Sequence, residues 1–191
     1  MGVPISPDLP LHDAIVRAAA RSDPCAPWIH PSSVALILAR DAGGAGGAVL
    51  RSLVALSFTL ALRISEVRRL RPVDFDLAAG RVRVYPSKKA SLEPVWVAAP
   101  GKAMEWARRA LEACPNRDPL TPLTTLSSRA LNRWLRTELA GTRDQDKSWH
   151  GLRRGRATQL AHLGVPIGDI MRVGRWNAAS TARRYVHPWA D

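Results

Sequence analysis

The spacing of apolar residues divides this chain into a helical first part, a short strand-rich middle and a helical last part. Helical spacing runs over residues 31–42, 48–60 and 63–70, and the last helix ends before Arg71-Pro72 because proline disfavours helix at the preceding residue. A Gly-rich turn, residues 43–47, separates the first two helices. Residues 1–31 contain six prolines and one short helical run, so residues 1–30 are predicted to form an N-terminal arm.

The middle of the chain carries β-branched residues in short runs over residues 73–77, 81–85 and 95–98. Turn-forming residues 78–80 and 86–94 separate these runs, which predicts a three-stranded antiparallel sheet. Helical spacing then returns over residues 102–113, 127–139, 150–163, 166–173 and 180–186. The order predicts an α+β fold, mainly helical, in which residues 31–191 form one domain.

The net charge of the chain indicates what kind of partner it binds. The 191 residues include 28 Lys and Arg against 16 Asp and Glu, a formal charge of +12, and 24 of the 28 are arginine. Such an excess is typical of a nucleic-acid-binding protein, although an ordinary basic surface is the alternative. Cys25 and Cys114 lack neighbouring ligand residues, so neither a disulfide nor a zinc site is predicted. No apolar run reaches the roughly 18 residues of a membrane span, and we expect an intracellular protein.

Two pairs of residues with helical spacing suggest phosphate chemistry. Arg63 and Glu66 are three residues apart, so the carboxylate can orient the guanidinium, although a plain surface ion pair has the same spacing. His150 and Arg153 repeat this spacing, and Ser148 is placed to cap their helix. Imidazole, guanidinium and the helix N-terminus could together meet a phosphate.

In their order and spacing, these motifs resemble the catalytic domain of the tyrosine recombinase, or phage integrase, family. The resemblance covers residues 31–188 and rests on Leu-Arg-Ile-Ser-Glu at 62–66, the His-x-x-Arg box at 150–153, Gly-Arg-Trp at 174–176 and the late Tyr185. It implies cleavage and rejoining of DNA at specific sites, as in recombination or integration by mobile elements.

The resemblance also implies a role for each site residue. Arg63 and Arg153 would clamp the scissile phosphate, with Glu66 in support, and Tyr185 would attack phosphorus to give a 3′-phosphotyrosyl intermediate. His150 would take the tyrosine proton, and the indole N–H of Trp176 would donate to phosphate unless the ring belongs to the core. The family's leaving-group acid is a hairpin lysine, here Lys88 in preference to Lys89.

The remaining expectations concern partners and surroundings. We expect double-stranded DNA as partner, a homotetramer on DNA, a DNA-associated location, and neither a metal nor another cofactor. Residues expected to contact DNA are Lys89, Arg154, Arg175, Arg183 and Arg184, whereas His187 is a weaker candidate. Among the departures from the family, only the arm occupies the place of the core-binding domain, and Ala61 replaces a common glycine, which we expect a helix to tolerate. DNA relaxation of the type IB topoisomerase kind and non-enzymatic DNA binding remain the alternatives.

Overall fold

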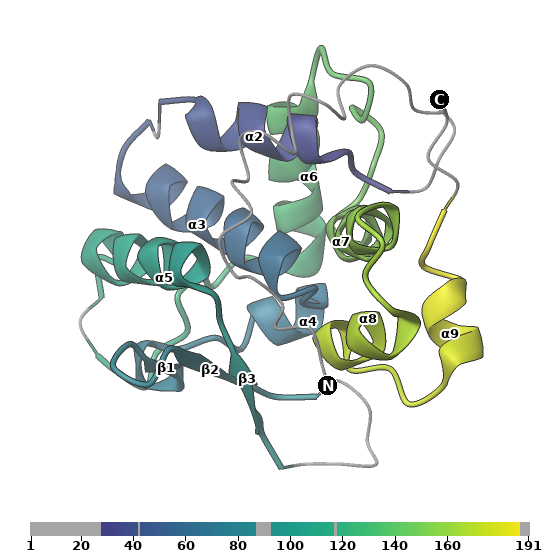
Figure 1. Ribbon diagram of the computed structural model, residues 1–191. Helices are drawn as coiled ribbons and strands as arrows, with labels where there is room; N and C mark the ends of the chain where they lie inside the picture. Colours follow the sequence, from purple (N-terminus) through teal and green to yellow (C-terminus); the bar gives the residue numbers. More distant parts are fainter. Residues whose placement is uncertain (1–27, 42, 87–92, 117, 188–191) are drawn as a thin grey trace.

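The computed structural model describes residues 28–41, 43–86, 93–116 and 118–187. Its helices surround one central helix, with a small sheet at one side (Figure 1). In chain order the elements are α2 (Pro31–Ala39), α3 (Ala45–Thr59), α4 (Ile64–Val67), the 3-10 turn Pro72–Asp74, β1 (Phe75–Asp76), β2 (Arg81–Val84), β3 (Val95–Ala98), α5 (Gly101–Ala113), α6 (Ser128–Leu139), α7 (His150–His162), α8 (Ile167–Gly174) and α9 (Ala179–Arg183).

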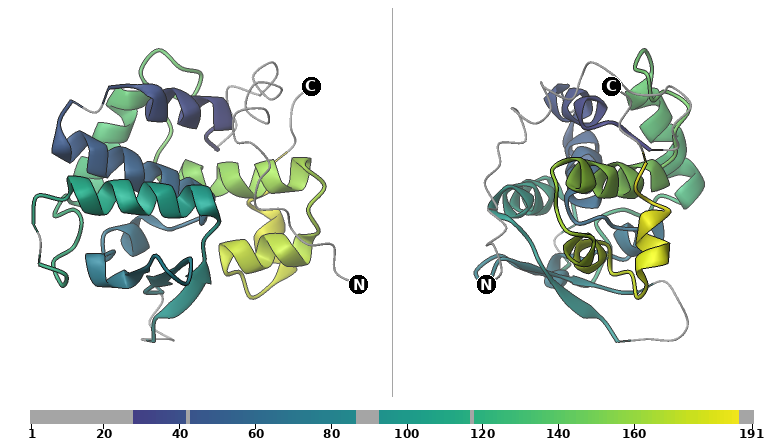
Figure 2. Two further views of the ribbon diagram at one scale, coloured as in Figure 1. Left: turned by 60° about the vertical axis from the view of Figure 1, so that its left-hand side comes forward. Right: turned by 45° about the vertical axis from the view of Figure 1, so that its right-hand side comes forward.

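The central helix is α3, which is buried on nearly every side. Its residues 51–58 are all buried, as expected for a helix whose apolar residues are not confined to one stripe. Helices α2, α5 and α7 pack against it. The views agree that α5 and the sheet lie to one side of α3, and α7, α8 and α9 to the other (Figures 1 and 2).

The sheet is three-stranded and antiparallel in the order β1-β2-β3, which confirms the predicted topology. Val82 and Val84 of β2 point into the core, whereas the alternate residues Arg81 and Arg83 do not. The first strand is shorter than predicted because Pro72–Asp74 forms a 3-10 turn, in which the buried Asp74 carboxylate accepts the Arg71 main-chain N–H at 3.0 Å.

A second, smaller core lies beneath α7, α8 and α9. Its buried members are Ala157, Leu160, Ile170, Trp176 and Ala182, and Tyr185 packs against them from outside. Helix α9 ends at Arg183 rather than at residue 186 as predicted, so Tyr185 lies in the turn that follows the helix.

The corner between α3 and α4 differs from the sequence prediction. Helix α4 has four residues, with Arg63 as its N-cap, whereas a helix over residues 63–70 was predicted. Ala61 has φ 48°, a left-handed conformation outside any helix, so the expectation that a helix tolerates this alanine was wrong. Among the described residues, no helix is both long and apolar enough to span a membrane.

Candidate active site

The α3–α4 corner places Arg63 beside a buried carboxylate. Glu66 is 1% exposed, and its Oε1 accepts a 2.7 Å hydrogen bond from Nη1 of Arg63. Its Oε2 accepts the main-chain N–H of Arg63 at 2.8 Å and Nη2 of Arg175, also at 2.8 Å. The Arg63 side chain keeps 26% of its surface exposed, so Glu66 holds one end of a guanidinium that solvent or a ligand can still reach.

Helix α7 contributes Arg153, whose side chain is fully buried. Its Nη1 and Nη2 donate to the main-chain carbonyls of Ala61 and Gly174, at the corners that follow α3 and α8. Its buried Nε–H has no acceptor among the described residues. Arg153 is therefore a rigidly held cation with hydrogen-bonding capacity left over.

The Tyr185 ring lies within this cluster. Its centroid is 5.3 Å from that of His150 in an edge-on arrangement and 4.7 Å from that of Trp176. The guanidinium carbons of Arg153 and Arg154 lie 5.5 Å and 5.7 Å from the ring centre. Residues from α7, the α8–α9 connection and the segment after α9 therefore meet at the tyrosine.

Trp176 is 5% exposed, and its ring lies 4.4 Å from the guanidinium carbon of Arg153. Its buried Nε1–H has no hydrogen-bond partner among the described residues. Gly174 makes room for the indole, because a Cβ there would lie 1.8 Å from Cζ3 of Trp176. The ring thus serves in the second core and also carries an unused donor next to Arg153.

The buried cations shift the proton affinities of this site. Burial and the positive charges of Arg154, Arg153 and Arg63 lower the pKa of His150. Burial and the charges of Arg63 and Arg175 lower the pKa of Arg153 to about 9, so it remains charged at neutral pH. Burial alone would raise the pKa of Glu66, but Arg175 and Arg63 outweigh that effect and hold it below its ordinary value. The site therefore combines a neutral imidazole with an excess of fixed positive charge.

Thr158 of α7 is a positioning residue that the sequence analysis missed. Its buried hydroxyl donates to the Tyr185 carbonyl and accepts the main-chain N–H of His187, each at 3.2 Å. These two hydrogen bonds hold the tyrosine turn, residues 185–187, against α7. A single Thr inside an Arg-rich helix gives no sequence signal for this role.

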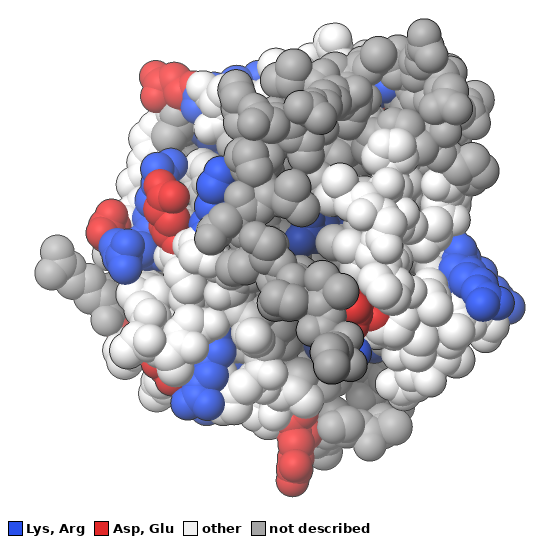
Figure 3. All heavy atoms as spheres, in the orientation of Figure 1, with Lys and Arg blue, Asp and Glu red and all other residues white. Residues whose placement is uncertain are grey.

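Other predicted residues fall in varied places. Lys88 and Lys89 lie outside the described residues. Arg183 and Arg184 are exposed at the end of α9, where Figure 3 shows basic side chains at the right edge. Arg175, predicted to contact DNA, instead directs its guanidinium into the protein.

The predicted cap of α7 also differs from the structure. Trp149 is the N-cap and no side chain caps the helix, so the expectation that the Ser148 hydroxyl does so was wrong. The main chain of Ser148 instead accepts the Gly151 N–H at 2.8 Å, and Asn132 of α6 accepts the Trp149 N–H at 2.7 Å. These bonds, rather than a serine cap, hold the start of α7 and with it His150.

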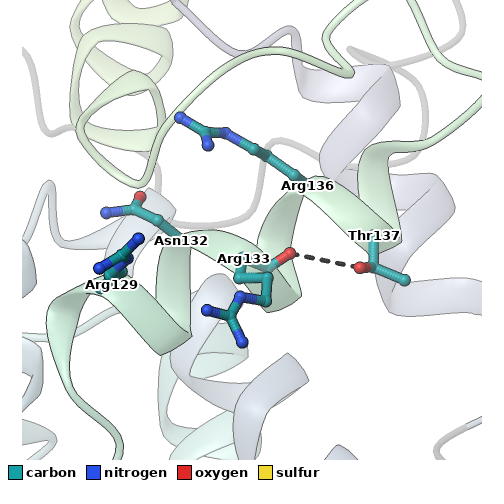
Figure 4. Close-up of a pocket in the computed structure, with 5 residues that line it drawn as sticks. All are labelled: Arg129, Asn132, Arg133, Arg136 and Thr137. Carbon is teal, nitrogen blue, oxygen red and sulfur yellow. Dashed lines mark hydrogen bonds between the residues drawn. The ribbon is translucent and has the colours of Figure 1, made fainter.

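Helix α6 adds basic residues close to this site. Arg129, Arg133 and Arg136 are exposed and line a surface hollow with Asn132 and Thr137 (Figure 4). Within the described ranges, none of the three guanidiniums has an acidic partner. Their spacing along one helix is a signal that the sequence analysis did not use.

The comparisons with solved structures place the fold. XerA recombinase superposes with a TM-score of 0.68 at 17% identity, over 84% of this chain and 58% of that one. XerH recombinase bound to its difH substrate gives 0.66 at 19%, over 85% and 51%. The Tn1549 transposon integrase in complex with transposon right end DNA gives 0.67 at 12%, over 87% and 63%.

This chain therefore spans about half to two thirds of the length of these proteins, and at such identities the likeness concerns the fold. A search of curated proteins found no match. The profile of the phage integrase family matches residues 27–190, a span that includes every described residue. The chain belongs to the phage integrase family.

Proposed function

We propose that this chain cleaves and rejoins double-stranded DNA at specific sites through a covalent bond to Tyr185. The observation that carries the proposal is the meeting of Tyr185 with His150 and Arg153, from segments far apart in sequence, beside the oriented Arg63. Membership of the phage integrase family and the DNA complexes of XerH and the Tn1549 integrase support it.

The site residues that the structure describes each have a chemical role in this reaction. Arg63, which is partly exposed, contacts the non-bridging oxygens of the scissile phosphate, and the buried guanidinium of Arg153 beside Tyr185 adds positive charge that stabilises the charge developing on them. The neutral imidazole of His150 accepts the Tyr185 proton, since a phenol with a pKa of about 10 is a weak nucleophile at pH 7. Trp176 donates its indole N–H, which has no partner among the described residues, to a phosphate oxygen.

The bond changes balance without an added oxidant or energy source. A bond forms between the Tyr185 oxygen and phosphorus, and the bond from phosphorus to the 5′ oxygen breaks. The released 5′ oxygen takes a proton, for which Lys88 is the proposed donor and Lys89 the alternative. Reversal with a second 5′ hydroxyl rejoins the strand, so the phosphodiester energy is conserved.

The DNA duplex lies across the basic residues around this site, of which Arg154 is half-buried and the others are exposed. Arg154 borders the tyrosine, Arg183 and Arg184 extend from the end of α9, and the α6 arginines extend the surface beyond the start of α7. Separate basic side chains of this kind suit a series of individual phosphate contacts. We further propose that the chain assembles on DNA as a homotetramer. Its location in the cell is then that of the DNA it binds.

The experiment uses nicked duplexes of randomised sequence that lose a short strand after cleavage and so trap the covalent complex. Wild-type protein should form an adduct that survives denaturing gel electrophoresis, whereas Tyr185→Phe should bind the same DNA and form none. If neither protein forms an adduct, strand transfer is refuted and non-enzymatic DNA binding remains as the function. Plasmid relaxation without recombinant products would instead indicate a topoisomerase.

A further inference from the structure

Arg175 has a backbone conformation that its side chain disfavours. It caps α8 with φ 54° and ψ 48°, the left-handed region in which glycine is the usual residue. A left-handed residue next to the second core suggests that the side chain does something that glycine cannot.

The Arg175 guanidinium joins two distant corners of the chain. Its Nη1 donates to the carbonyls of Leu60 at 3.0 Å and Val173 at 3.1 Å. Its Nη2 donates to the carbonyl of Ala61 at 3.2 Å and to Oε2 of Glu66 at 2.8 Å. The side chain is 16% exposed, and four acceptors occupy its two terminal nitrogens.

The same acceptors hold the two arginines of the site. Glu66 uses its other oxygen to orient Arg63. The Ala61 carbonyl also accepts from Arg153, and the Gly174 carbonyl just before Arg175 accepts the second terminal nitrogen of Arg153. Arg175 therefore shares one hydrogen-bond partner with Arg63 and another with Arg153, and all four of its acceptors belong to the protein.

We propose that Arg175 is a positioning residue that fixes Arg63 and Arg153 relative to each other, rather than a DNA contact. This inference rests on the proposed function, because it assigns the two arginines to one phosphate. Loss of the guanidinium leaves Glu66 with Arg63 alone and frees the α3–α4 corner from the end of α8. A misplacement of about 1 Å in a catalytic group costs on the order of 100-fold in rate.

Two variants separate positioning from stability. Arg175→Gly and Arg175→Ala both remove the guanidinium, but only glycine relieves the left-handed backbone, so the Gly variant should melt about 2–4 °C above the Ala variant. We expect both to form the phosphotyrosyl adduct on the order of 100-fold more slowly than wild type in single turnover at saturating DNA, with the Kd for DNA changed less than about 3-fold. Millimolar guanidinium ion should partly restore the rate of Arg175→Gly.

Arg172→Ala is the matched control, since Arg172 lies on the same helix with 79% of its side chain exposed, and it should keep the wild-type rate. If the rates of the two Arg175 variants follow their melting temperatures, the side chain is merely structural. If both variants cleave normally but bind DNA weakly, Arg175 is a DNA contact. Either outcome overturns the proposal.

A measurement without DNA distinguishes failure of this inference from failure of the proposed function. The Nη protons of Arg63, bonded to Glu66, should give resolved NMR signals in the wild-type protein that broaden in Arg175→Gly and remain in Arg172→Ala. Unchanged signals in Arg175→Gly would contradict the positioning role even if the wild-type protein formed no adduct. Broadened signals with no wild-type adduct would instead refute only the strand-transfer chemistry.

Discussion

Replacing Glu66 by glutamine tests the electrostatic centre of the site. The carboxylate is buried and lies between two guanidiniums, with Arg63 on one oxygen and Arg175 on the other. Glutamine has nearly the same shape, but it removes the negative charge and turns an N–H₂ group toward one of the arginine donors. Glu66→Gln therefore leaves two cations close together, with Arg153 nearby, and no carboxylate between them.

The magnitude follows from the number of charged contacts. A hydrogen bond to a charged group contributes about 1.5–3 kcal/mol, and removal of one partner from a buried ion pair costs about 3–5 kcal/mol. Because glutamine keeps one acceptor, we expect a loss of about 3 kcal/mol in the free energy of unfolding at pH 7. At about 2–4 °C per kcal/mol for a domain of this size, Tm should fall by about 6–12 °C.

The assay is thermal and urea denaturation of wild type and Glu66→Gln at several pH values. The control is Glu105→Gln, which removes an ion pair to Arg109 whose two side chains are each 52% exposed, and which should change stability by less than about 1 kcal/mol. Since the folded pKa of Glu66 lies below its ordinary value near 4.5, its contribution is complete above that pH and is lost as pH falls through the folded pKa. The gap between wild type and Glu66→Gln should therefore narrow in acid. Equal stabilities at pH 7, or a gap that widens in acid, would show that the Glu66 carboxylate does not stabilise the fold through these two arginines.

Three further predictions concern α7, α8 and the tyrosine turn. A Cβ on Gly155 would lie 2.1 Å from the Ile29 carbonyl oxygen, whereas one on Gly168 would meet nothing within 4 Å. Urea denaturation should therefore show Gly155→Ala destabilised by about 1–3 kcal/mol and Gly168→Ala stabilised by about 0.5–1 kcal/mol. Equal effects of the two substitutions would contradict the packing of Ile29 against α7. Thr158→Val should slow single-turnover adduct formation by about 10-fold, because the tyrosine turn loses both hydrogen bonds to the hydroxyl. Thr158→Ser should retain the wild-type rate. A valine variant as fast as wild type would show that Thr158 does not position Tyr185. Because burial and three arginines lower the pKa of His150, its neutral form should support adduct formation down to below pH 6.5, and an acid limb centred above 6.5 would rule out His150 as the proton acceptor.

The sequence was sufficient for the order of elements and for the residues with recognisable spacing. Periodicity located the buried α3 and all three strands, since side-chain alternation and helical spacing are local properties. The His-x-x-Arg spacing placed His150 and Arg153 at the N-terminal end of one helix, as found. Arg63 was paired correctly with Glu66, because spacings of three residues suit a helical turn even when the helix is very short.

The parts that could not be predicted depend on contacts between distant segments. Alanine at position 61 was expected to be tolerated by a helix, but the chain turns there, and the carbonyls of this corner accept hydrogen bonds from Arg153 and Arg175, more than 100 residues away in the latter case. Arg175 was expected to contact DNA, and its sequence neighbours Gly174 and Trp176 give no sign that its guanidinium points into the protein. Thr158 has no local pattern at all. In each case the role is set by tertiary structure, which overrides local propensity.

The most direct test of the account is to identify the residue that carries DNA in the trapped complex. Trypsin cleavage after Arg184 would release a peptide that begins at Tyr185, so mass spectrometry of the DNA-linked fragment can locate the bond. The chain has only two tyrosines, and the other, Tyr85, contacts Arg71 and Asp74 near the sheet. We expect a 3′-phosphate linked to Tyr185, and an adduct that Tyr85→Phe leaves intact. Linkage to Tyr85, to any other residue, or through a 5′-phosphate would rule out cleavage by Tyr185.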